Sequence, residues 1–478
     1  MMPKPTLTTI SRDEALEIHS RALDLLSRVG VRFEDPEVAK VLLDAGATKA
    51  DDRVLVPEEM VNEALKNVPK KIDFYDRDGK KVATLGDGAL IFNPGSAAIK
   101  ILDYGATEPR TPTLEDLKNL VVIVENLEFI DAQSTALVPG DTPIEIRDAV
   151  RLYPILRYSR KPVITGAFTV ENLPVMLEML KVVREDAWRR PFTIFDACPS
   201  PPLSWSKVTS RNVIDLAKAG IPSEIVSMPG LGATAPVTIV GAATLHHAEV
   251  LSGIVLAQMV SKDAPVIYGG SPALMHPRYG TPLIVAPESL LVSLIYRDLA
   301  RFLELPSHTY MGLSDSKLVD YQAGAEEAYS ALAAVLAGFD VVSGPGMLEF
   351  ESVQSLEKLV LDNEVCGLVK RVSRGFGMSA EEIAIEVIEE TLLRKGGNFL
   401  LHPHTRRYLR REVHVPRVWD ATPRSRWGMR SVYDEAHTTV TKLLKEGSYH
   451  ELSPEALAEL NKVYERLWKR AGSEPKYV

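Results

Sequence analysis

Ionisable and hydroxyl side chains crowd the segment 306–317, which reads Pro-Ser-His-Thr-Tyr-Met-Gly-Leu-Ser-Asp-Ser-Lys. An apolar strand pattern ends inside this segment, and strand ends in α/β folds often carry functional groups. The carboxyl group of Asp315 could balance a positive charge on a ligand, and Lys317 or His308 could bind a carboxylate. The alternative is an internal Asp–Lys pair that supports the strand end.

A second segment with a candidate functional side chain follows one helix later in the chain. An alanine-rich helical pattern over residues 322–337 leads into a strand pattern over 339–342, and the segment after it ends at Glu349. The carboxyl ends of parallel strands meet at one edge of a sheet, so this βαβ unit would bring Glu349 close to Asp315 and Lys317. We predict that these three residues are catalytic.

The elements that must position these groups alternate regularly between strand and helix, with a period of roughly 30 to 45 residues. Strand patterns cover residues 90–93, 129–133, 162–167, 192–196, 223–228, 265–269, 307–312 and 339–342. Helical patterns between them include residues 114–125, 172–183, 239–259, 288–302 and 322–337. Eight such units predict an α/β fold of the (β/α)8 TIM-barrel class over residues 89–352.

Different patterns flank this region on both sides. Residues 1–88 predict a small N-terminal α+β cap, in which Ser11 and Glu14 form a capping box for a helix over 12–29. Further helices over residues 36–45 and 57–67 and small antiparallel strands within 70–85 complete this cap. Residues 353–478 predict a C-terminal helical extension that packs against the barrel or a neighbouring subunit.

Composition and spacing argue against several classes of protein. A net charge of -9, without a basic run outside residues 406–411, gives no support for nucleic-acid binding. The N-terminus lacks the apolar stretch of a signal peptide, and no apolar run reaches the roughly 18 residues of a membrane span, so we expect a cytoplasmic protein. Neither Cys198 nor Cys366 has metal-ligand spacing, and His246 and His247 would point about 100° apart on a helix. We expect no protein-bound metal.

Several motifs occur in a fixed order that covers nearly the whole chain. They are Ile18-His19 through Val31 with Asp35, Ser227-Met228-Pro229 with residues 232–238, Gly312 to Lys317 with Asp320 and Gln322, Leu356 to Glu364, and His402-Pro403-His404-Thr405. This collinear set resembles the trimethylamine methyltransferase family, barrel enzymes that move a methyl group from an amine to a corrinoid protein. Founding methylamine enzymes of that family carry pyrrolysine, whereas every residue here is a standard one. The chain therefore resembles the branch without pyrrolysine, whose substrates are quaternary amines such as glycine betaine.

The resemblance implies a displacement in which Co(I) of a cognate corrinoid protein takes a methyl group from a quaternary amine. The corrinoid (cobalamin) would come with that partner, because no Asp-x-His-x-x-Gly loop occurs in this chain. The barrel would hold the cation against aromatic faces, each of which contributes roughly 0.5 to 2 kcal/mol. The predicted substrate-binding residues are Phe92, Asn93, Phe168, Phe195, Trp205, Tyr268, His308, Tyr310, Gln322 and Phe350.

Other interpretations stay open. Each strand-end aromatic could fill a core layer rather than bind a cation. The chain could also be a barrel that binds a betaine-type ligand without methyl transfer, or a metal hydrolase, although the His and Cys spacing gives the latter no support. The sequence does not identify the amine. The helical extension and the paired arginines near the C-terminus favour a homo-oligomer.

Overall fold

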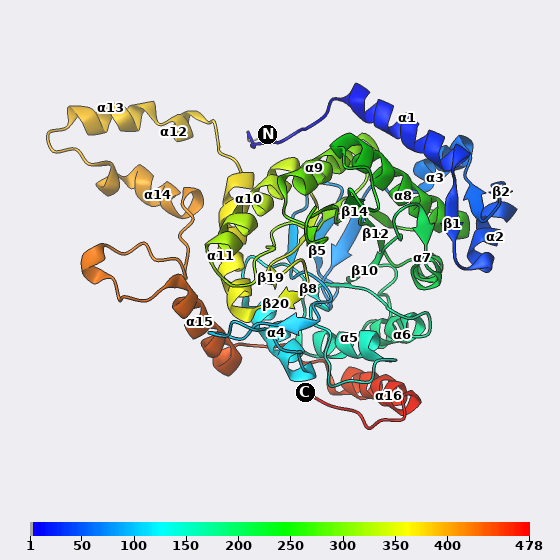
Figure 1. The fold of residues 1–478 in the computed structure, drawn as a ribbon. Coiled ribbons are helices and arrows are strands. Elements are labelled where there is room, and N and C mark those ends of the chain that lie inside the picture. The colour runs from blue at the N-terminus through cyan, green and yellow to red at the C-terminus, as the bar shows by residue number, and fades with distance from the viewer. Residues whose placement is uncertain (1–2) are drawn as a thin grey trace.

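Short parallel strands lie at the centre of the molecule and helices surround them (Figure 1). The computed structural model describes residues 3–478. In chain order the central strands are β6 (Ile91–Asn93), β8 (Gln133–Ser134), β9 (Val163–Thr165), β10 (Thr193–Ala197), β12 (Ser223–Ser227), β14 (Val266–Gly270), β17 (His308–Thr309) and β18 (Val341–Ser343). Each overlaps a predicted strand segment and extends at most one residue beyond it. The chain therefore has the mixed α/β alternation that the sequence predicts.

Helices connect these strands, and the predicted helices are present. They are α4 (Leu114–Asn126), α6 (Leu173–Val183), α8 (Ile239–Val260), α9 (Pro287–Phe302) and α10 (Tyr321–Ala337). Two connecting helices, α5 (Arg147–Tyr158) and α7 (Lys207–Ala219), are not among the predicted segments. In α5 the interior Pro154 explains the omission, because proline removes a helical hydrogen bond and usually signals a helix end.

The central strands pair in two parallel runs. One run has the order β14-β12-β10-β9-β8 and the other β17-β18-β6. A parallel bridge between Tyr268 and Ser307 links β14 to β17. Between β6 and β8, the carbonyl of Phe92 accepts hydrogen bonds from the N–H groups of Asp131 and Ala132, at 2.7 and 3.1 Å. Consecutive strands of the chain are therefore neighbours in space.

An apolar layer fills the space between the first residues of these strands. The hairpin of β4 (Ile72–Tyr75) and β5 (Lys81–Leu85) covers this end. Side chains from strands and hairpin pack in one cluster, which comprises Ile72, Phe74, Leu85, Ile91, Ala132, Ile164, Ile194, Ile267 and Val341. Because strand side chains alternate, the residue two positions after each of these strand residues faces the same interior.

The N-terminal region contains three helices and short strands within residues 12–67. Ser11 and Glu14 form the expected capping box at the start of α1 (Arg12–Arg28). The other elements are β1 (Val31–Phe33), α2 (Pro36–Asp44), β2 (Thr48–Ala50), β3 (Arg53–Leu55) and α3 (Glu58–Asn67). Their sheet has the order β11-β1-β3-β2, where β11 (Ser204–Trp205) belongs to the loop that follows β10. The unit is therefore hydrogen-bonded to the strand-and-helix region.

The chain after the last central strand packs against the body at two places and leaves it in between. Helix α11 (Leu356–Ser373) contacts α10 and α15 (Val432–Glu446), and α16 (Pro454–Arg470) lies against α5 and α6. Between α11 and α15, residues 376–430 extend from the body as an arm (Figure 1). The arm contains α12 (Ala380–Ile383), α13 (Ile385–Leu393), η1 (Phe399–Leu401), α14 (Pro403–Glu412) and η2 (Arg424–Arg426), and its side chains are mostly exposed.

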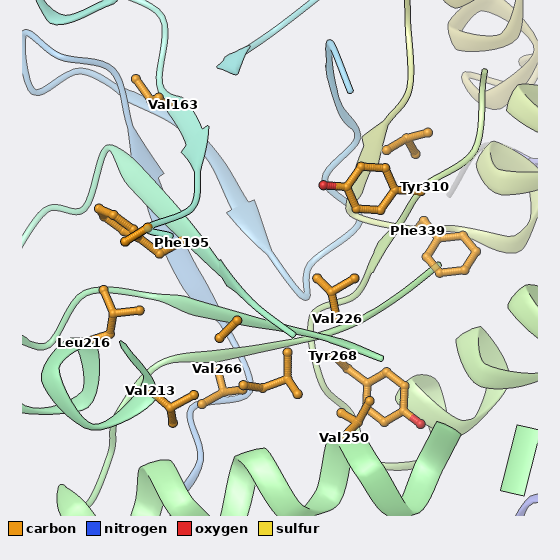
Figure 2. Close-up of a cluster of buried hydrophobic side chains, with 14 of the residues drawn as sticks. Val163, Phe195, Val213, Leu216, Val226, Val250, Val266, Tyr268, Tyr310 and Phe339 are labelled. Atoms are coloured by element: carbon orange, nitrogen blue, oxygen red, sulfur yellow. The ribbon is translucent and has the colours of Figure 1, made fainter. Parts of the chain in front are cut away.

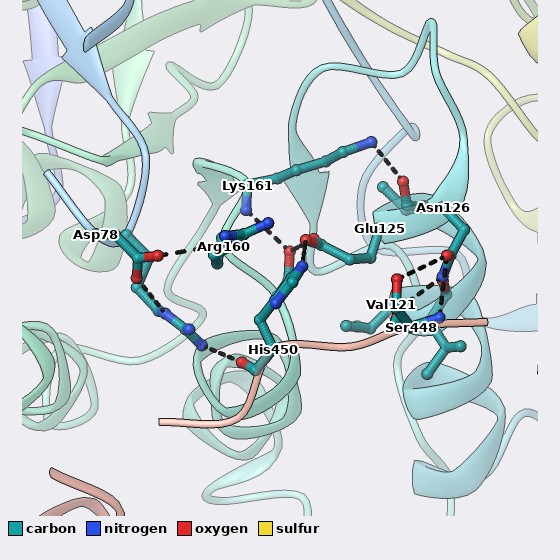
Figure 3. Close-up of polar contacts among 12 residues, drawn as sticks. Asp78, Val121, Glu125, Asn126, Arg160, Lys161, Ser448 and His450 are labelled. Carbon is teal, nitrogen blue, oxygen red and sulfur yellow. Dashed lines mark hydrogen bonds and ion pairs between the residues drawn. The ribbon is translucent and has the colours of Figure 1, made fainter. Parts of the chain in front are cut away.

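The segment that joins α15 to α16 is tied to the body by polar contacts (Figure 3). The amide of Asn126 donates to the Ser448 carbonyl at 2.8 Å, and the guanidinium of Arg77 donates to the His450 carbonyl at 2.8 Å. The His450 imidazole lies 3.7 Å from the Glu125 carboxylate. These contacts bind the last helices to α4 and to the end of the strand region that the β4–β5 hairpin covers.

Helix α8 corrects one expectation from the sequence. In the part of the chain that the structure describes, α8 is the helix long and apolar enough to cross a membrane. An 18-residue stretch of it has a mean hydropathy of 1.5, but 78% of that stretch is buried inside the protein. His246, His247 and Glu249 are buried within this helix. Burial by α1, α3, α7 and α9 on its sides accounts for its composition as a core helix.

Candidate active site

A cavity of about 370 Å³ lies beyond the carboxyl ends of the central strands, where α/β folds usually place their sites. Small sheets in the loops surround this region, with the orders β13-β15-β16 and β19-β20-β7. Their strands are β7 (Lys100–Ile101), β13 (Gly230–Leu231), β15 (Ala273–Met275), β16 (Pro282–Leu283), β19 (Met347–Leu348) and β20 (Val353–Gln354). The cavity is lined by Ser96, Ala97, Thr135, Arg151, Gly166, Ala167, Phe168, Asp196, Cys198, Thr209, Val226, Met228, Tyr310, Phe350 and Glu351.

Strand alternation explains why Asp196 faces this cavity and its neighbour does not. Ile194 belongs to the apolar layer inside the strands, so Asp196, two residues later on β10, faces the same interior. Phe195 points the other way and is buried beside Val213 and Leu216 of α7 (Figure 2). Alternate residues of one strand, Ile194 and Asp196, therefore supply the apolar layer and a polar group of the cavity.

Two carboxyl groups lie side by side near the floor of the cavity. Asp196 on β10 and Glu224 on β12 are register partners; Glu224 is fully buried and Asp196 is partly buried. Burial raises the pKa of Asp196, and burial together with the nearby Asp196 carboxyl holds the pKa of Glu224 well above its usual range. The Tyr310 hydroxyl donates to Asp196 at 3.2 Å and also contacts the Ser96 hydroxyl at 2.6 Å. The pair favours at least one bound proton or a cationic ligand.

Beneath the pair, a buried polar chain connects three further strands. The His308 imidazole lies 3.6 Å from the Glu224 carboxyl group and 3.0 Å from the Ser343 hydroxyl. Ser343 donates to the amide oxygen of Asn93 at 2.9 Å. Burial lowers the pKa of His308 to about 3, so its ring is neutral at physiological pH. His308 and Asn93 therefore do not line the cavity; they belong to the polar chain that contacts Glu224.

A strained segment forms the wall opposite this floor. Glu349, Phe350 and Glu351 have φ angles of 46°, 58° and 65°, a left-handed conformation that non-glycine residues adopt rarely. This conformation brings both Phe350 and Glu351 to the cavity. Burial raises the pKa of Glu351 to about 8, and the Ser271 hydroxyl donates to its carboxyl group at 3.3 Å.

The predicted catalytic residues lie behind this wall rather than in the cavity lining. The Asp315 carboxyl accepts hydrogen bonds from the N–H groups of Ile284 and Val285, at 3.3 and 3.1 Å, and burial raises its pKa to about 6. The Lys317 ammonium donates to the Asp315 carbonyl at 2.9 Å and lies 3.8 Å from the centroid of the Phe350 ring. The structure thus brings these residues close to Glu349, whose N–H donates to the Ser316 carbonyl at 2.9 Å.

Arg151 is a buried cation that the sequence analysis misses. It lies on α5, donates to the carbonyls of Thr135 and Gly166 at 2.8 and 3.3 Å, and stacks 4.3 Å from the centroid of Phe168. Burial lowers the pKa of Arg151 to about 10, so it stays charged at physiological pH. Its position on a helix that contains Pro154 hides it, but an arginine within so apolar a run is itself a usable signal.

Phe168, Tyr310 and Phe350 are the predicted substrate-binding residues that line the cavity. The others lie elsewhere. Tyr268 and Phe92 point outward from their strands: the Tyr268 hydroxyl contacts His247 of α8 at 2.7 Å, and Phe92 lies below Lys370 of α11. Figure 2 shows the Tyr268 ring beside Val250 of α8.

Trp205 and Gln322 lie outside the cavity lining for different reasons. The Trp205 indole is fully buried and donates to the Ser252 hydroxyl at 2.9 Å, on the helix side of β11. Gln322 is exposed at the start of α10, where its amide donates to Glu326 at 2.9 Å. Together with Phe92, Phe195 and Tyr268, these side chains pack the fold or face solvent.

The acidic residues of the cavity and Cys198 are the functional candidates that the sequence analysis does not select. Asp196, Glu224 and Glu351 occur in strands or loops that it does identify, but their inward orientation is visible only in the fold. Burial raises the pKa of the Cys198 thiol, so this residue is a neutral lining group.

Among residues 3–478, no group of three or more His, Cys, Asp or Glu side chains could hold a metal ion.

Comparisons with known proteins agree with this architecture. A profile described as trimethylamine methyltransferase matches residues 2–471. A glycine betaine methyltransferase of Desulfitobacterium hafniense strain Y51 is 28% identical over 98% of this chain and 99% of that protein. A trimethylamine methyltransferase of Methanosarcina thermophila is 29% identical over 94% of each chain. The crystal structure of Methanosarcina barkeri monomethylamine methyltransferase, at 12% identity, covers 98% of this chain and 89% of that chain with a TM-score of 0.52. This last likeness concerns the fold alone.

Proposed function

The chain belongs to the trimethylamine methyltransferase family and is a methyltransferase, and we propose that it moves a methyl group from a quaternary amine to Co(I) of a cognate corrinoid protein. The observation that carries the proposal is the composition of the cavity. It combines the carboxyl groups of two partly buried residues, Asp196 and Glu351, with the aromatic side chains Tyr310 and Phe350. A quaternary ammonium has no N–H to donate, so carboxylates and aromatic faces are the groups that stabilise it.

The proposed reaction requires positioning more than proton transfer. The methyl carbon exchanges its bond to nitrogen for a bond to cobalt, and the nitrogen keeps the bonding electron pair. A neutral amine leaves, and no proton moves. The residues around the cavity hold the ammonium with one methyl group directed to the incoming partner and keep water away, which strengthens the electrostatic contacts.

The carboxyl groups that line the cavity have a second effect on this reaction. A carboxylate in van der Waals contact with the reacting methyl group would itself be a competing nucleophile. Asp196 already accepts a hydrogen bond from Tyr310, and Glu351 accepts one from Ser271, so their lone pairs are partly occupied. We assign them to charge balance, and Asp315, Lys317 and Glu349 to the support of the wall that carries Phe350.

Several further assignments belong to the same proposal. The two parallel strand runs form one closed (β/α)8 barrel, supported by the bridge between Tyr268 and Ser307 and by the bonds to the Phe92 carbonyl. The corrinoid partner docks over the carboxyl ends of the strands, where the cavity lies. We place the enzyme in the cytoplasm.

A homo-oligomeric state is also part of the proposal. Its support is the arm, residues 376–430, which exposes large apolar side chains such as Leu392, Leu393 and Leu401, at 72%, 87% and 81% of their surface. Apolar patches of this kind commonly mark protein–protein contacts. Sedimentation velocity over a range of concentrations measures the state directly, and a strictly monomeric protein would contradict this part of the proposal.

The decisive experiment mixes the enzyme with Co(I) cobalamin and a panel of methylated amines, and follows the loss of the Co(I) absorbance. We expect one quaternary amine to be demethylated, and the Asp196→Asn variant to be much slower with the same amine. Reactions without enzyme and with trimethylamine provide the controls. Stabilisation of the protein by a quaternary amine without any methyl transfer would instead indicate a betaine-type binding protein.

A further inference from the structure

We propose that a hydrogen-bonded chain of three side chains, His19, His247 and Tyr268, is an acid-sensitive latch that holds helix α1 on the body of the molecule. A proton taken up by His19 opens the latch, and α1 then separates more readily from α8 and α9. The proposal concerns the attachment of the N-terminal helix and does not depend on the proposed methyl transfer.

The three side chains connect α1 to the central strands through α8. Helix α1 lies along α8 and α9 at the outside of the molecule and also contacts α3 (Figure 1). The Nδ1 atom of His19 lies 2.8 Å from Nε2 of His247 on α8, and Nδ1 of His247 lies 2.7 Å from the hydroxyl of Tyr268 on β14. His247 and Tyr268 are fully buried, whereas His19 is 7% exposed and lines a surface groove of about 740 Å³. The chain therefore leads from a groove that solvent can enter to a central strand.

The direction of these hydrogen bonds follows from the number of protons. The Tyr268 hydroxyl has no other hydrogen-bond partner within residues 3–478, and a buried O–H without an acceptor is unfavourable. We therefore assign Tyr268 as the donor to Nδ1 of His247. A neutral imidazole carries one proton, so that of His247 is on Nε2, from which it is donated to Nδ1 of His19. The proton of His19 is then on its Nε2 atom.

This arrangement has no place for a further proton. The two ring nitrogens that lack one, Nδ1 of His19 and Nδ1 of His247, already accept hydrogen bonds. A proton on Nδ1 of His19 would face the Nε2–H of His247, unless His247 moved its own proton to Nδ1. The Tyr268 hydroxyl would then accept instead of donate, and its proton would be left without an acceptor. Either outcome removes a buried hydrogen bond, and exposure of His19 to water avoids that loss.

The charged groups around His19 come from two helices. Those that line the groove are Arg12, Asp13 and Glu17 of α1 and Glu58 of α3. Helix α9 contributes an uncharged group, the Phe302 ring, whose centroid lies 5.7 Å from that of His19. Helix α8 contributes His247, and burial holds the pKa of that imidazole well below its ordinary value. Glu58 is therefore the group that favours a charged His19.

The net effect of these surroundings has a definite sign. Burial lowers the pKa of His19 from its ordinary value of 6.5, and the opposing influence of Glu58 is smaller. When α1 separates, His19 returns to its ordinary value and takes up a proton at mildly acidic pH. The stability that neutral His19 gives to the attached state is thus complete above about pH 6.5 and is lost as pH falls toward the lowered pKa.

Hydrogen exchange of the α1 backbone tests the latch, followed by mass spectrometry between about pH 5 and 8 and corrected for the intrinsic exchange rate. In the wild type, the protection of α1 should fall below about pH 6.5 by up to about tenfold per pH unit, as expected for one proton taken up on opening. Helix α16 provides the internal reference, because it contains no histidine and packs against α5 and α6. Its protection should change little over the same range.

Three variants separate the latch from ordinary burial of a histidine. His19→Asn should abolish the pH dependence of α1, because an amide oxygen can accept the hydrogen bond of His247 but takes up no proton. Tyr268→Phe should make the dependence shallower, since no hydroxyl proton then loses its acceptor when His247 reverses. His437→Asn is the matched control: its Nδ1 also contacts another helix, 2.9 Å from the Glu357 carboxyl group of α11, but it lies outside the latch. It should leave the dependence unchanged.

Each of three results would overturn the proposal. They are wild-type protection of α1 that follows that of α16 at every pH, an unchanged slope in His19→Asn, and an unchanged slope in Tyr268→Phe. The last result would show that burial of His19 alone sets the pH dependence, without the chain. Should His19→Asn fail to fold, the slope in Tyr268→Phe decides.

Discussion

Two buried charge clusters in this protein use the same residue types in opposite ways. Between α10 and α11, the Lys358 ammonium lies 2.5 Å from the Asp362 carboxylate and 3.2 Å from that of Glu327. The N–H of Gly346 adds a hydrogen bond to Asp362 at 2.6 Å. Near the floor of the cavity, one oxygen of Asp196 and both oxygens of Glu224 lack a hydrogen-bond partner in the described structure, whereas in the Lys358 cluster one oxygen of Glu327 does.

We interpret the Lys358 cluster as structural and the carboxyl groups at the cavity as groups that a cationic ligand would neutralise. Moving an ion out of water is unfavourable, and the cluster around Lys358 offsets this within the fold. Burial raises the pKa of the carboxyl groups in both clusters, but within the described residues no lysine or arginine forms an ion pair with the carboxyl groups at the cavity. An unmatched buried charge therefore identifies the site more directly than a position at a strand end.

The largest expected effect concerns the matched cluster. Lys358→Met leaves Glu327 and Asp362 buried without their cation, and the free energy of unfolding should fall by about 3 to 5 kcal/mol. Urea denaturation followed by circular dichroism measures this change. Lys370→Met is the control on the same helix, because its partly exposed pair with Asp131 should contribute about 1 kcal/mol or less. Equal losses in the two variants would remove the contrast between the clusters.

The unmatched cluster should respond in the opposite direction. Asp196→Asn removes a partly buried carboxyl group that forms no ion pair within the described residues, so the unfolding free energy should stay unchanged or rise by up to about 1 kcal/mol. Tetramethylammonium binding should weaken about tenfold or more, since a buried counter-charge is lost. Calorimetry and thermal melting test both halves. A destabilised variant with full affinity would show that Asp196 is structural.

A smaller effect is the pH dependence of binding through Glu351, whose pKa lies near 8 in the free enzyme. A quaternary ammonium favours the ionised carboxylate, so affinity should rise by at most about tenfold per pH unit below 8 and then level off. Stability of the free enzyme has the reverse sign: the raised pKa favours folding at low pH, and this contribution is lost as pH rises toward 8.

Glu351→Gln should flatten that profile. The charged groups that act on Glu351 are Asp196 and Asp315, which keep their own titrations in this variant. The dissociation constant for tetramethylammonium, measured between pH 6 and 9 in steps of about half a pH unit, resolves the change expected for one proton. A profile that stays unchanged in Glu351→Gln would assign the proton to Asp196 or Asp315.

The smallest expected effect concerns the wall. Lys317→Met removes the ammonium above the Phe350 ring and should weaken ligand binding by about 0.5 to 1 kcal/mol. Lys118 is the control, because it lies 5.9 Å from the centroid of Tyr158, remote from the cavity lining. If Lys118→Met weakens binding as much as Lys317→Met, the support of Phe350 by Lys317 has no specific role.

The sequence predicts the order of the strands well and their orientation poorly. The segment Thr-Ile-Phe-Asp-Ala of β10 is buried on both faces, as parallel strands usually are, so it shows no alternation that would separate Phe195 from Asp196. The same ambiguity applies to Tyr268 and Phe92. Tyr310 and Phe350 were predictable because each follows a strand and enters a loop.

Two other features of the site have physical reasons for escaping a sequence analysis. Arg151 lies on a helix with an internal proline, which breaks the expected helical pattern. Glu351 reaches the cavity through three consecutive left-handed residues, and no local preference of Glu, Phe or Glu favours that conformation. Tertiary packing alone determines it, so the sequence around Glu349 indicates the region but not the side chain that faces the ligand.

The arm has a consequence for how the chain tolerates proteolysis. It leaves the body after α11, and the chain returns with α15, which packs against α11 and α4, and with α16, which packs against α5 and α6. Every residue that lines the cavity precedes the arm in the chain. A single cut within the arm should therefore give two fragments that separate under denaturing conditions yet remain together, with an intact cavity, in native buffer.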